Sequence, residues 1–212
     1  MNLTLDHVTP APLAGVSFSS EIWNTSVSFE KGKFHKIFAP SGKGKSTFIH
    51  ILYGLRKDFT GTATIGSSSI NSISNDQWAK LRATSISIVF QDLRLFQELT
   101  ARENIEVKTS LLKENKENEI ERFSEALGVS HLLEKKIKIL SYGERQRIAI
   151  IRSLMQPFEW LLLDEPFGHL DEANIIKACE LIESECKKRG AGILVTSLGT
   201  DYFLKYDNQY SL

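Results

Sequence analysis

Residues 39 to 47 of the chain read Ala39-Pro40-Ser41-Gly42-Lys43-Gly44-Lys45-Ser46-Thr47. The residues from Lys33 to Phe38 before this turn predict a strand, and those from Ser46 to Gly54 after it predict a helix. Glycines let successive backbone N–H groups point inward around phosphate groups, and the N-terminus of a helix adds its dipole. The stretch therefore predicts a strand, a phosphate-binding loop and a helix within an α/β fold.

Each part of the predicted phosphate-binding loop has its own task. The Lys45 ammonium is expected to reach the β- and γ-phosphates of a nucleotide, and the Ser46 hydroxyl is expected to ligate Mg²⁺. The usual pattern begins with glycine, whereas this loop begins with Ala39, whose methyl group adds strain if the position needs an unusual φ. A glycine-rich turn that binds nothing is the alternative, and the Gly-Lys-Ser-Thr run argues against it. The residues expected to bind nucleotide are Ser41, Gly42, Lys43, Gly44, Lys45, Ser46 and Thr47.

A second apolar stretch ends in two acids, in the sequence Trp160-Leu161-Leu162-Leu163-Asp164-Glu165-Pro166. A buried strand that delivers carboxylates at its C-terminal end suits a site for metal-bound phosphate. Asp164 is expected to hold Mg²⁺ through its water shell, and Glu165 is expected to polarise the attacking water. The alternative is that the two acids only mark where the strand leaves the core. The phosphate-binding loop upstream favours the catalytic interpretation.

The composition is that of an ordinary globular protein. The chain has 212 residues, of which 42% are hydrophobic and 25% charged, which suits one α/β domain with a subdomain. Lys plus Arg and Asp plus Glu both number 26, so the formal net charge is zero and nucleic acid is not an expected partner. No apolar run approaches the roughly 20 residues that span a bilayer, and we expect no signal peptide. Cys179 and Cys186 are expected to be buried free thiols on one helix face.

Short strand-like segments alternate with longer helix-like ones, which predicts a mainly parallel sheet flanked by helices. Capping-box spacing predicts helix starts at Ser74, with Gln77, and at Thr100, with Glu103. A further helix is expected from about Glu172 to Arg189. Strands are expected around Leu3 and Leu5, Val16 and Phe18, Val27 and Phe29, Thr62–Ile65, Ser85–Phe90, Trp160–Leu163 and Ile193–Thr196.

Three more motifs follow the phosphate-binding loop. They are Val89-Phe90-Gln91-Asp92, Leu140-Ser141-Tyr142-Gly143-Glu144-Arg145-Gln146-Arg147 and, after the acidic strand, Gly168-His169-Leu170-Asp171. In this order they resemble the Q-loop, the LSGGQ signature and the D-loop of the ATP-binding cassette (ABC) family, and the resemblance covers nearly the whole chain. The residues around Gln91 also resemble exporter-type cassettes, including those of lipoprotein-release and macrolide-export systems.

The resemblance implies an ATPase subunit of an ABC transporter. Gln91 would contact Mg²⁺ and the attacking water, and would act in catalysis with Glu165 and Lys45. Ser141 and Gly143 would hydrogen-bond the γ-phosphate of ATP held on the opposite subunit, so the sites would form only in a homodimer or a pseudo-symmetric cassette dimer. Ser141 with Glu144 is also a capping box, and the two roles are compatible because a helix N-terminus binds anions.

The implied fold is a P-loop NTPase core, with a mainly parallel sheet flanked by helices, an N-terminal antiparallel β region and an inserted helical subdomain. Residues 1–91 and 156–212 would form the nucleotide-binding core, and residues from about 92 to 155 would form the helical subdomain with the signature. Residues from 92 to about 100 would meet membrane-spanning permease subunits. The expected location is therefore the cytoplasmic face of the inner or cell membrane, as a peripheral subunit.

The sequence departs from the family pattern at several positions. Ala39 replaces a glycine, and in the signature Tyr142 replaces a glycine and Glu144 a glutamine. Ser197 stands where the family usually has its switch histidine, and a serine cannot carry a positive charge, so the γ-phosphate is expected to be stabilised less. His169 is a candidate to replace that histidine in part.

The adenine-stacking aromatic of the family is also missing from its expected place. That place falls near residues 12 to 16, which include no aromatic residue. Phe18 is the nearby candidate for stacking on adenine, and packing in the core is the alternative interpretation of this side chain.

Two other functions compete with the transporter ATPase. One is a low-turnover switch that regulates a partner by dimerising around ATP. Ser197 and Ala39 motivate this alternative, whereas the intact Lys45, Asp164 and Glu165 argue against it. The other is a soluble cassette in DNA repair or translation, but such proteins usually carry long coiled-coil insertions or two cassettes in one chain.

Overall fold

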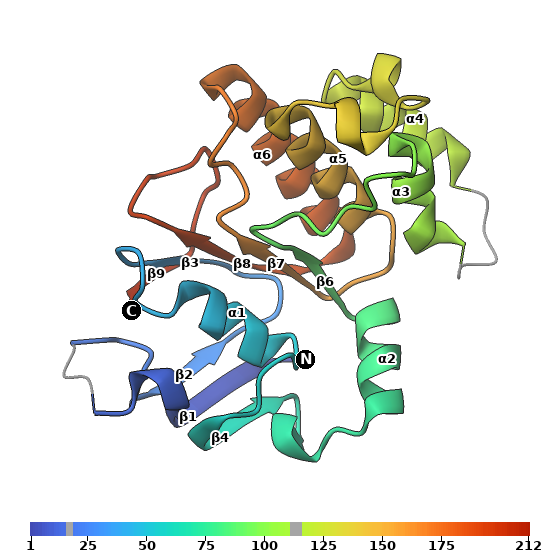
Figure 1. Cartoon of the computed structure of the whole chain (residues 1–212). Coiled ribbons are helices and arrows are strands. Elements are labelled where there is room, and N and C mark those ends of the chain that lie inside the picture. The colour runs from blue at the N-terminus through green and yellow to red at the C-terminus, as the bar shows by residue number, and fades with distance from the viewer. Residues whose placement is uncertain (16–18, 111–115) are drawn as a thin grey trace.

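A five-stranded parallel sheet forms the centre of the molecule (Figure 1). The computed structural model describes residues 1–15, 19–110 and 116–212. All neighbouring strands of this sheet run parallel, which confirms the predicted mainly parallel sheet. In spatial order the strands are β6 (Ile86–Val89), β7 (Trp160–Asp164), β8 (Gly192–Ser197), β3 (Phe34–Phe38) and β9 (Asn208–Ser211).

A second sheet is antiparallel and comes from the N-terminal part of the chain, as the sequence predicted. The predicted strand around Val16 and Phe18 lies outside the described residues. In spatial order the strands are β2 (Ser26–Phe29), β1 (Leu3–Pro10), β4 (Phe59–Ile65) and β5 (Ser68–Ser69).

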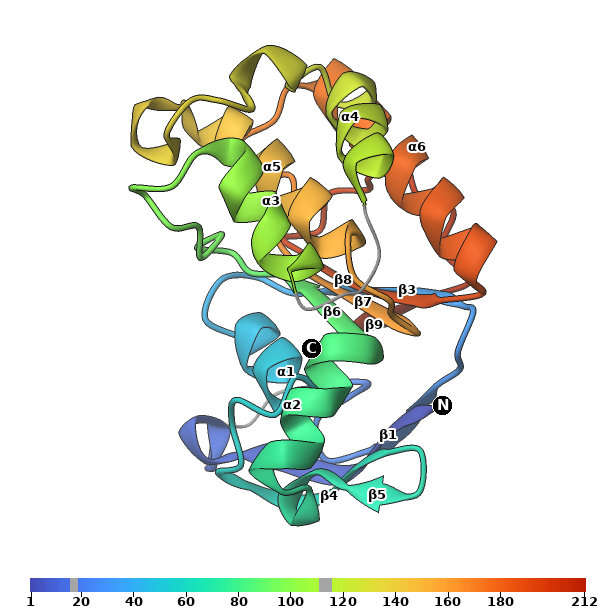
Figure 2. The same ribbon diagram turned by 90° about the vertical axis from the view of Figure 1, so that its right-hand side faces the viewer.

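Helices cover both faces of the parallel sheet (Figures 1 and 2). On one face, α1 (Lys45–Leu52) lies between the parallel and the antiparallel sheet, near α2 (Asn75–Thr84). On the other face are α3 (Ala101–Thr109), α4 (Glu117–Ala126), α5 (Tyr142–Leu154) and α6 (Glu172–Arg189). The described residues also include the short 3-10 helices η1 (Ala11–Leu13), η2 (Ile70–Ser72), η3 (Ser130–Leu132) and η4 (Ile137–Ile139).

All three capping boxes expected from the sequence are present. In each, the N-cap side chain accepts a hydrogen bond from the backbone N–H three residues on, and the Gln or Glu at that position accepts one from the N-cap N–H. These reciprocal bonds satisfy N–H groups that the first helical turn leaves without partners. Helix α6 has the predicted bounds and ends at Gly190, whose φ of 58° suits the left-handed cap.

Two apolar clusters fill the two sides of the parallel sheet. One joins α1, α2 and the antiparallel sheet to the sheet's lower face, and the other joins α3, α4, α5 and α6 to its upper face. Strands covered on both faces account for the continuous apolar runs in the sequence. The upper cluster continues from α3 and α4 through α5 to the sheet. The division of the chain into a core and a helical subdomain, with boundaries near residues 92 and 155, stays a prediction.

The two cysteines lie on α6 inside the upper cluster, as predicted. Both are free and buried, and burial raises the pKa of each thiol to about 12. Thiols with so high a pKa remain protonated near neutral pH and react slowly. Cys179 and Cys186 therefore contribute to packing.

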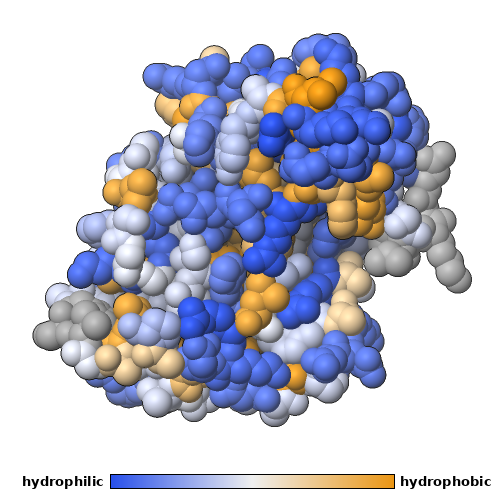
Figure 3. All heavy atoms as spheres, in the orientation of Figure 1, coloured by the Kyte–Doolittle hydropathy of each residue, from blue (hydrophilic) through white to orange (hydrophobic). Residues whose placement is uncertain are grey.

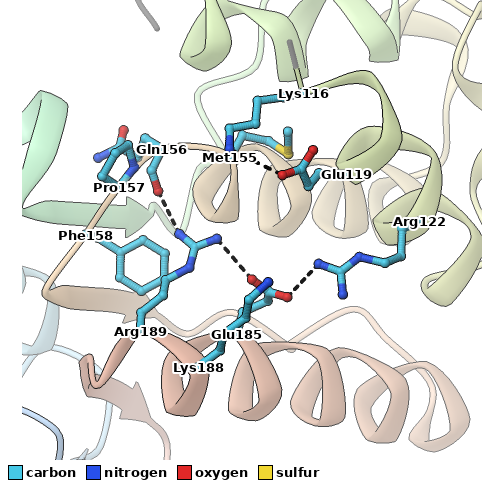
Figure 4. Close-up of a pocket in the computed structure, with 10 residues that line it drawn as sticks. All are labelled: Lys116, Glu119, Arg122, Met155, Gln156, Pro157, Phe158, Glu185, Lys188 and Arg189. Carbon is cyan, nitrogen blue, oxygen red and sulfur yellow. Dashed lines mark hydrogen bonds and ion pairs between the residues drawn. The ribbon is translucent and has the colours of Figure 1, made fainter. Parts of the chain in front are cut away.

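A group of charges joins α4, α5 and α6 (Figure 4). Glu185 is 2% exposed, and its two oxygens accept from Arg122 of α4 at 2.7 Å and from Arg189 at 3.1 Å. Arg189 also donates to the carbonyl of Gln156 at 2.8 Å, just past α5, and its guanidinium lies 4.5 Å from the centre of the Phe158 ring. Burial opposes ionisation of Glu185, but the hydrogen bonds and positive charges of Arg122 and Arg189 together outweigh it and lower the pKa of this carboxyl. The residues that line this hollow of about 290 Å³ therefore hold α4, α5 and α6 together.

Replacing Glu185 with glutamine is expected to lower the free energy of unfolding by about 2 kcal/mol at pH 7. The loss is below the roughly 3–5 kcal/mol of a fully buried broken pair, because the Arg122 side chain is 53% exposed. Since the pKa is lowered in the folded state, this stability is present above the ordinary carboxyl pKa of about 4.3 and is lost as pH falls through the folded value. Urea unfolding at pH 7 measures the stability lost on substitution. Urea unfolding of the unmodified chain near pH 3 measures the stability lost when Glu185 is protonated.

The matched control is Glu183→Gln on the same helix. Glu183 pairs with Lys187 one turn on, and the Lys187 side chain is 66% exposed, so a pair of this spacing is expected to contribute only about 0.5 kcal/mol. If the Glu185 and Glu183 variants lost the same free energy of unfolding at pH 7, Glu185 would not hold the three helices together as described.

Within the described ranges, no helix combines the length and the apolarity that crossing a bilayer requires. The face of the molecule in Figure 3 is mostly hydrophilic, and its apolar side chains gather in small groups. Scattered apolar side chains of this kind are usual on protein surfaces.

Candidate nucleotide-binding site

The predicted phosphate-binding loop leads from β3 into α1 and takes the backbone form that its glycines permit. Gly42 and Gly44 have φ angles of 79° and 95°, a region that L side chains rarely adopt. A Cβ at Gly44 would also lie 3.0 Å from Leu13 Cδ1, a close contact that the Leu13 side chain would have to relieve. The loop therefore needs glycine at these two positions.

Ala39, the first departure from the family pattern, is accommodated. It is absent from the non-glycine residues with positive φ, so the methyl group adds no backbone strain. Ala39 is 2% exposed, and its N–H donates to the carbonyl of Ser197 at 3.2 Å. This bond ties the start of the loop to the end of β8.

Lys45 lies across the loop and next to the acidic strand end. Its Nζ donates to the carbonyl of Ala39 at 2.8 Å and to that of Pro40 at 3.1 Å, and it lies 3.2 Å from Oε1 of Glu165. The side chain is only 4% exposed. The Lys45 side chain is therefore held against the loop backbone and beside Glu165.

Asp164 and Glu165 leave β7 next to the loop, and one threonine holds both. Thr196 of β8 is in register with Asp164; its hydroxyl donates to Oδ1 of Asp164 at 2.8 Å and accepts from the Glu165 N–H at 3.1 Å. Asp164 is 2% exposed; burial raises the pKa of this carboxyl, although hydrogen bonds from Thr196 and Ser46 act against the rise. The sequence reasoning missed this role of Thr196, for which only the register of two strands gives a signal.

Glu165 has the unusual φ of 47°. A left-handed conformation costs a residue with a side chain about 1–2 kcal/mol, and such strain concentrates at functional sites. The bond from its N–H to Thr196 stabilises this turn. The turn brings the Glu165 carboxylate to Lys45.

Gln91 stands at the end of β6 and faces the start of α1. Its Oε1 accepts from the Ser46 hydroxyl at 3.3 Å. Ser46, Gln91 and Asp164 line one hollow of about 430 Å³. A second hollow, of about 300 Å³, is lined by Pro12, Leu13, Ser41, Gly42, Gly44, Lys45, Ser46, Thr47, Gln91 and Glu165.

The two hollows share Ser46 and Gln91, so the phosphate-binding loop, the Q-loop residue and both acids meet in one place. At the rim are Pro12 and Leu13, which are aliphatic. The aromatic candidate for stacking on adenine, Phe18, lies outside the described residues. Stacking by Phe18 stays a prediction.

Two signature residues, Ser141 and Gly143, stand apart from this site. Ser141 is the N-cap of α5, and its side chain accepts from the Glu144 N–H at 3.3 Å. Ser141 is exposed and Gly143 is half-buried, and neither lines the two hollows at the phosphate-binding loop. This position leaves Ser141 available to a ligand outside its own subunit's site.

Ser197, at the family's histidine position, is fully buried. Its hydroxyl accepts from the Gly199 N–H at 3.2 Å, so the side chain is bonded to its own loop. The other histidine candidate, His169, packs its ring against Tyr142 with the centroids 4.1 Å apart. A contribution of His169 to phosphate stabilisation stays a prediction.

The family model described as ABC transporter matches residues 22–168. The lipoprotein-releasing system ATP-binding protein LolD of Legionella pneumophila (strain Lens) is 33% identical over 86% of this chain and 82% of its own. The macrolide export ATP-binding/permease protein MacB of Campylobacter jejuni (serotype O:23/36, strain 81-176) is 33% identical over 82% of this chain and 28% of its own. These two relatives confirm the resemblance to lipoprotein-release and macrolide-export cassettes.

Solved structures agree with the family assignment. The dimeric bacterial ABC transporter cassette MJ0796 has a TM-score of 0.79 and 29% identity, over 92% of this chain and 88% of its own. The same cassette in a dimeric post-hydrolysis state, bound to ADP and Pi, has a TM-score of 0.77 and 28% identity, over 92% of this chain and 87% of its own. The chain therefore belongs to the ABC transporter family, as one of its ATP-binding and ATP-hydrolysing cassettes.

Proposed function

We propose that two copies of this chain, or this chain and a related cassette, close around two MgATP molecules and that hydrolysis through Glu165 reopens them, so that the cycle moves membrane subunits. One observation carries the proposal. The phosphate-binding loop, Gln91 and the two acids of β7 converge on adjoining hollows. Phosphoryl transfer to water requires this combination of positioned phosphate, metal ligands and base.

Mg²⁺ suits the donors that meet here. The Ser46 hydroxyl, the Gln91 amide oxygen and the buried Asp164 carboxylate are hard oxygen ligands, which Mg²⁺ prefers. Ser46 and Gln91 would hold the ion directly, and Asp164 through its water shell. When bound, the ion would neutralise charge on the phosphate oxygens.

The chain's own residues would supply the remaining chemistry. The Lys45 ammonium, held at the loop, would bind the β- and γ-phosphates, while the loop N–H groups from Ser41 to Thr47 bind phosphate oxygens. The Glu165 carboxylate would accept a proton from the attacking water. Gln91 would orient that water.

Dimerisation would complete each site. Ser141 is exposed at the N-terminus of α5, and neither Ser141 nor Gly143 lines the hollows at its own phosphate-binding loop. A helix N-terminus of this kind binds anions. In a head-to-tail dimer these residues would contact the γ-phosphate of ATP on the opposite subunit, and the dimeric MJ0796 structures support this arrangement.

The surface for the permease would lie beside the Q-loop. The chain segments around residues 97–99 and 137–138 are joined by backbone hydrogen bonds, from the Ile137 N–H to Leu99 and from the Lys138 N–H to Gln97. Next to them, Phe96 is 54% exposed and Ile139 68% exposed. Two such apolar side chains fit a cytoplasmic helix of a membrane subunit, and the chain would bind there at the cytoplasmic face of the membrane.

A low-turnover switch is the second candidate function. The observation that favours it is the buried Ser197, whose hydroxyl is bonded to the Gly199 N–H. No charge from this position would stabilise the γ-phosphate. Such a protein would dimerise on ATP and hydrolyse it only slowly.

Phosphate release separates the two functions. The purified chain, alone and with its membrane partner in vesicles, is incubated with MgATP, and Glu165→Gln serves as the inactive control. Repeated turnover that rises with the membrane partner is the expected result. ATP-dependent dimers without release above the Glu165→Gln control, even with the partner, would favour the switch.

A further inference from the structure

Tyr142 stands at the first position of the signature helix α5, where the family pattern has glycine. Its hydroxyl donates to the backbone carbonyl of Gln91 at 2.8 Å. The side chain lines the hollow that also holds Ser46 and Asp164. The signature helix therefore contacts the proposed catalytic site of its own subunit through the Tyr142 side chain.

Gln91 is therefore held by two hydrogen bonds, one to its side chain and one to its backbone carbonyl. Its side-chain oxygen accepts from the Ser46 hydroxyl at 3.3 Å, and its carbonyl accepts from Tyr142 at 2.8 Å. The first bond ties Gln91 to the phosphate-binding loop, and the second ties it to α5. A residue held between two elements keeps one orientation.

The backbone after Gln91 needs this support. Leu93 and Arg94 have φ angles of 60° and 46°, which residues with side chains rarely adopt. Arg152, near the end of α5, donates to both of their carbonyls, with 2.7 Å to that of Arg94. Side chains of α5 thus donate to three backbone carbonyls of this segment. Arg152 bonds those of Leu93 and Arg94, and Tyr142 bonds that of Gln91.

Tyr142 is itself supported by the D-loop. The His169 ring lies 4.1 Å from the Tyr142 ring, centroid to centroid, at an angle of 45°. The His169 N–H donates to Gln146 Oε1 at 3.3 Å, and a Cβ on Gly143 would lie 3.0 Å from the His169 carbonyl oxygen. The D-loop therefore packs closely on the first turn of α5 and limits the rotamers open to Tyr142.

We propose that Tyr142 is a positioning residue that fixes Gln91 in its own subunit, with His169 as its support. The inference rests on the proposed function, because Gln91 is taken to orient the attacking water. Tyr142 lies between Ser141 and Gly143, which face the opposite ATP in the proposed dimer. A single side chain thus links the signature of one site to the Gln91 of the other.

Tyr142→Phe tests the hydroxyl alone, because the ring that packs on His169 remains. The expected result is a fall in kcat of roughly 3- to 10-fold, the size of one lost hydrogen bond. KM for MgATP should change by less than about 2-fold, since the phosphate-binding loop is untouched. Tyr210→Phe, which removes a hydroxyl from β9, is the matched control and should retain the unmodified rate. A Tyr142→Phe rate equal to that of Tyr210→Phe would overturn the proposal.

A double-mutant cycle distinguishes positioning from a general loss of structure. In a Gln91→Ala background the side chain that Tyr142 is proposed to position is gone, so Tyr142→Phe should then change kcat by less than about 2-fold. An undiminished 3- to 10-fold loss in that background would mean that Tyr142 acts independently of Gln91, which would also overturn the proposal.

A third readout separates this inference from the proposed function. Amide hydrogen exchange over residues 90–94 requires no turnover, and Tyr142→Phe should raise it relative to Tyr210→Phe. If the unmodified chain fails to release phosphate, the proposed function fails while this exchange result still decides whether Tyr142 holds Gln91. Unchanged exchange in this segment would count against the proposal whatever the rate.

Discussion

Replacement of Lys45 with alanine is expected to abolish MgATP binding at concentrations that saturate the unmodified chain. The Lys45 Nζ is the cation at the centre of the phosphate-binding loop, bonded to the carbonyls of Ala39 and Pro40 and next to Glu165. Without it, an incoming phosphate would meet those oxygens with no compensating charge. A loss of at least about 100-fold in affinity, or about 3 kcal/mol, is expected for such a charged contact.

Titration calorimetry measures this loss, with Lys43→Ala as the control in the same loop. Lys43 is exposed and is expected to bind phosphate through its N–H alone, so its variant should lose less than about 5-fold. Thermal unfolding of both variants without nucleotide shows whether each remains folded. A folded Lys45→Ala chain that binds MgATP as tightly as Lys43→Ala would contradict the assignment of the phosphate site.

Local signals in the sequence predicted much of the fold. The capping boxes at Ser74, Thr100 and Ser141 mark helix starts correctly, because a cap depends on residues only three positions apart. The predicted helix from about Glu172 to Arg189 matches α6, which the structure shows to be capped by its neighbours Asp171 and Gly190. Predicted helix Ser46–Gly54 differs from α1 by one or two residues at its ends.

Contacts between distant segments could not be predicted in this way. Strand β9 was missed because Asn208–Ser211 is polar, and its place beside β3 becomes evident only from the sheet. Thr196 holds both acids through strand register, 32 residues along the chain from Asp164. Strain at Ala39, which was expected if the position needed an unusual φ, does not arise because Ala39 is not among the non-glycine residues with positive φ.

The motifs of the site were clear from the sequence, but the bonds among them were not. Tyr142 appeared only as a departure from the signature. Its bond to the Gln91 carbonyl spans 51 residues, and the fold alone brings the two together. A substitution in a motif can thus add a contact as well as remove one.

Replacement of Glu165 with glutamine is expected to lower kcat by about 10²- to 10⁴-fold, the usual contribution of a general base. Glutamine has the shape of glutamate and can keep the left-handed turn and the bond from the backbone N–H to Thr196. It cannot accept the proton of the attacking water near neutral pH. MgATP binding should therefore be retained, since Lys45 and the loop are unchanged.

Because hydrolysis is proposed to reopen the dimer, the Glu165→Gln chain should accumulate as a dimer in MgATP, and light scattering should detect a doubled mass. Glu125→Gln, an exposed site on α4, is the control and should neither lose turnover nor dimerise more than the unmodified chain. A Glu165→Gln chain that hydrolyses ATP at the control rate would exclude Glu165 as the base. A Glu165→Gln chain that is inactive yet monomeric in MgATP would support Glu165 as the base but contradict dimer closure around ATP at Ser141. Turnover and mass therefore test hydrolysis and dimerisation, the two steps of the proposed cycle, independently.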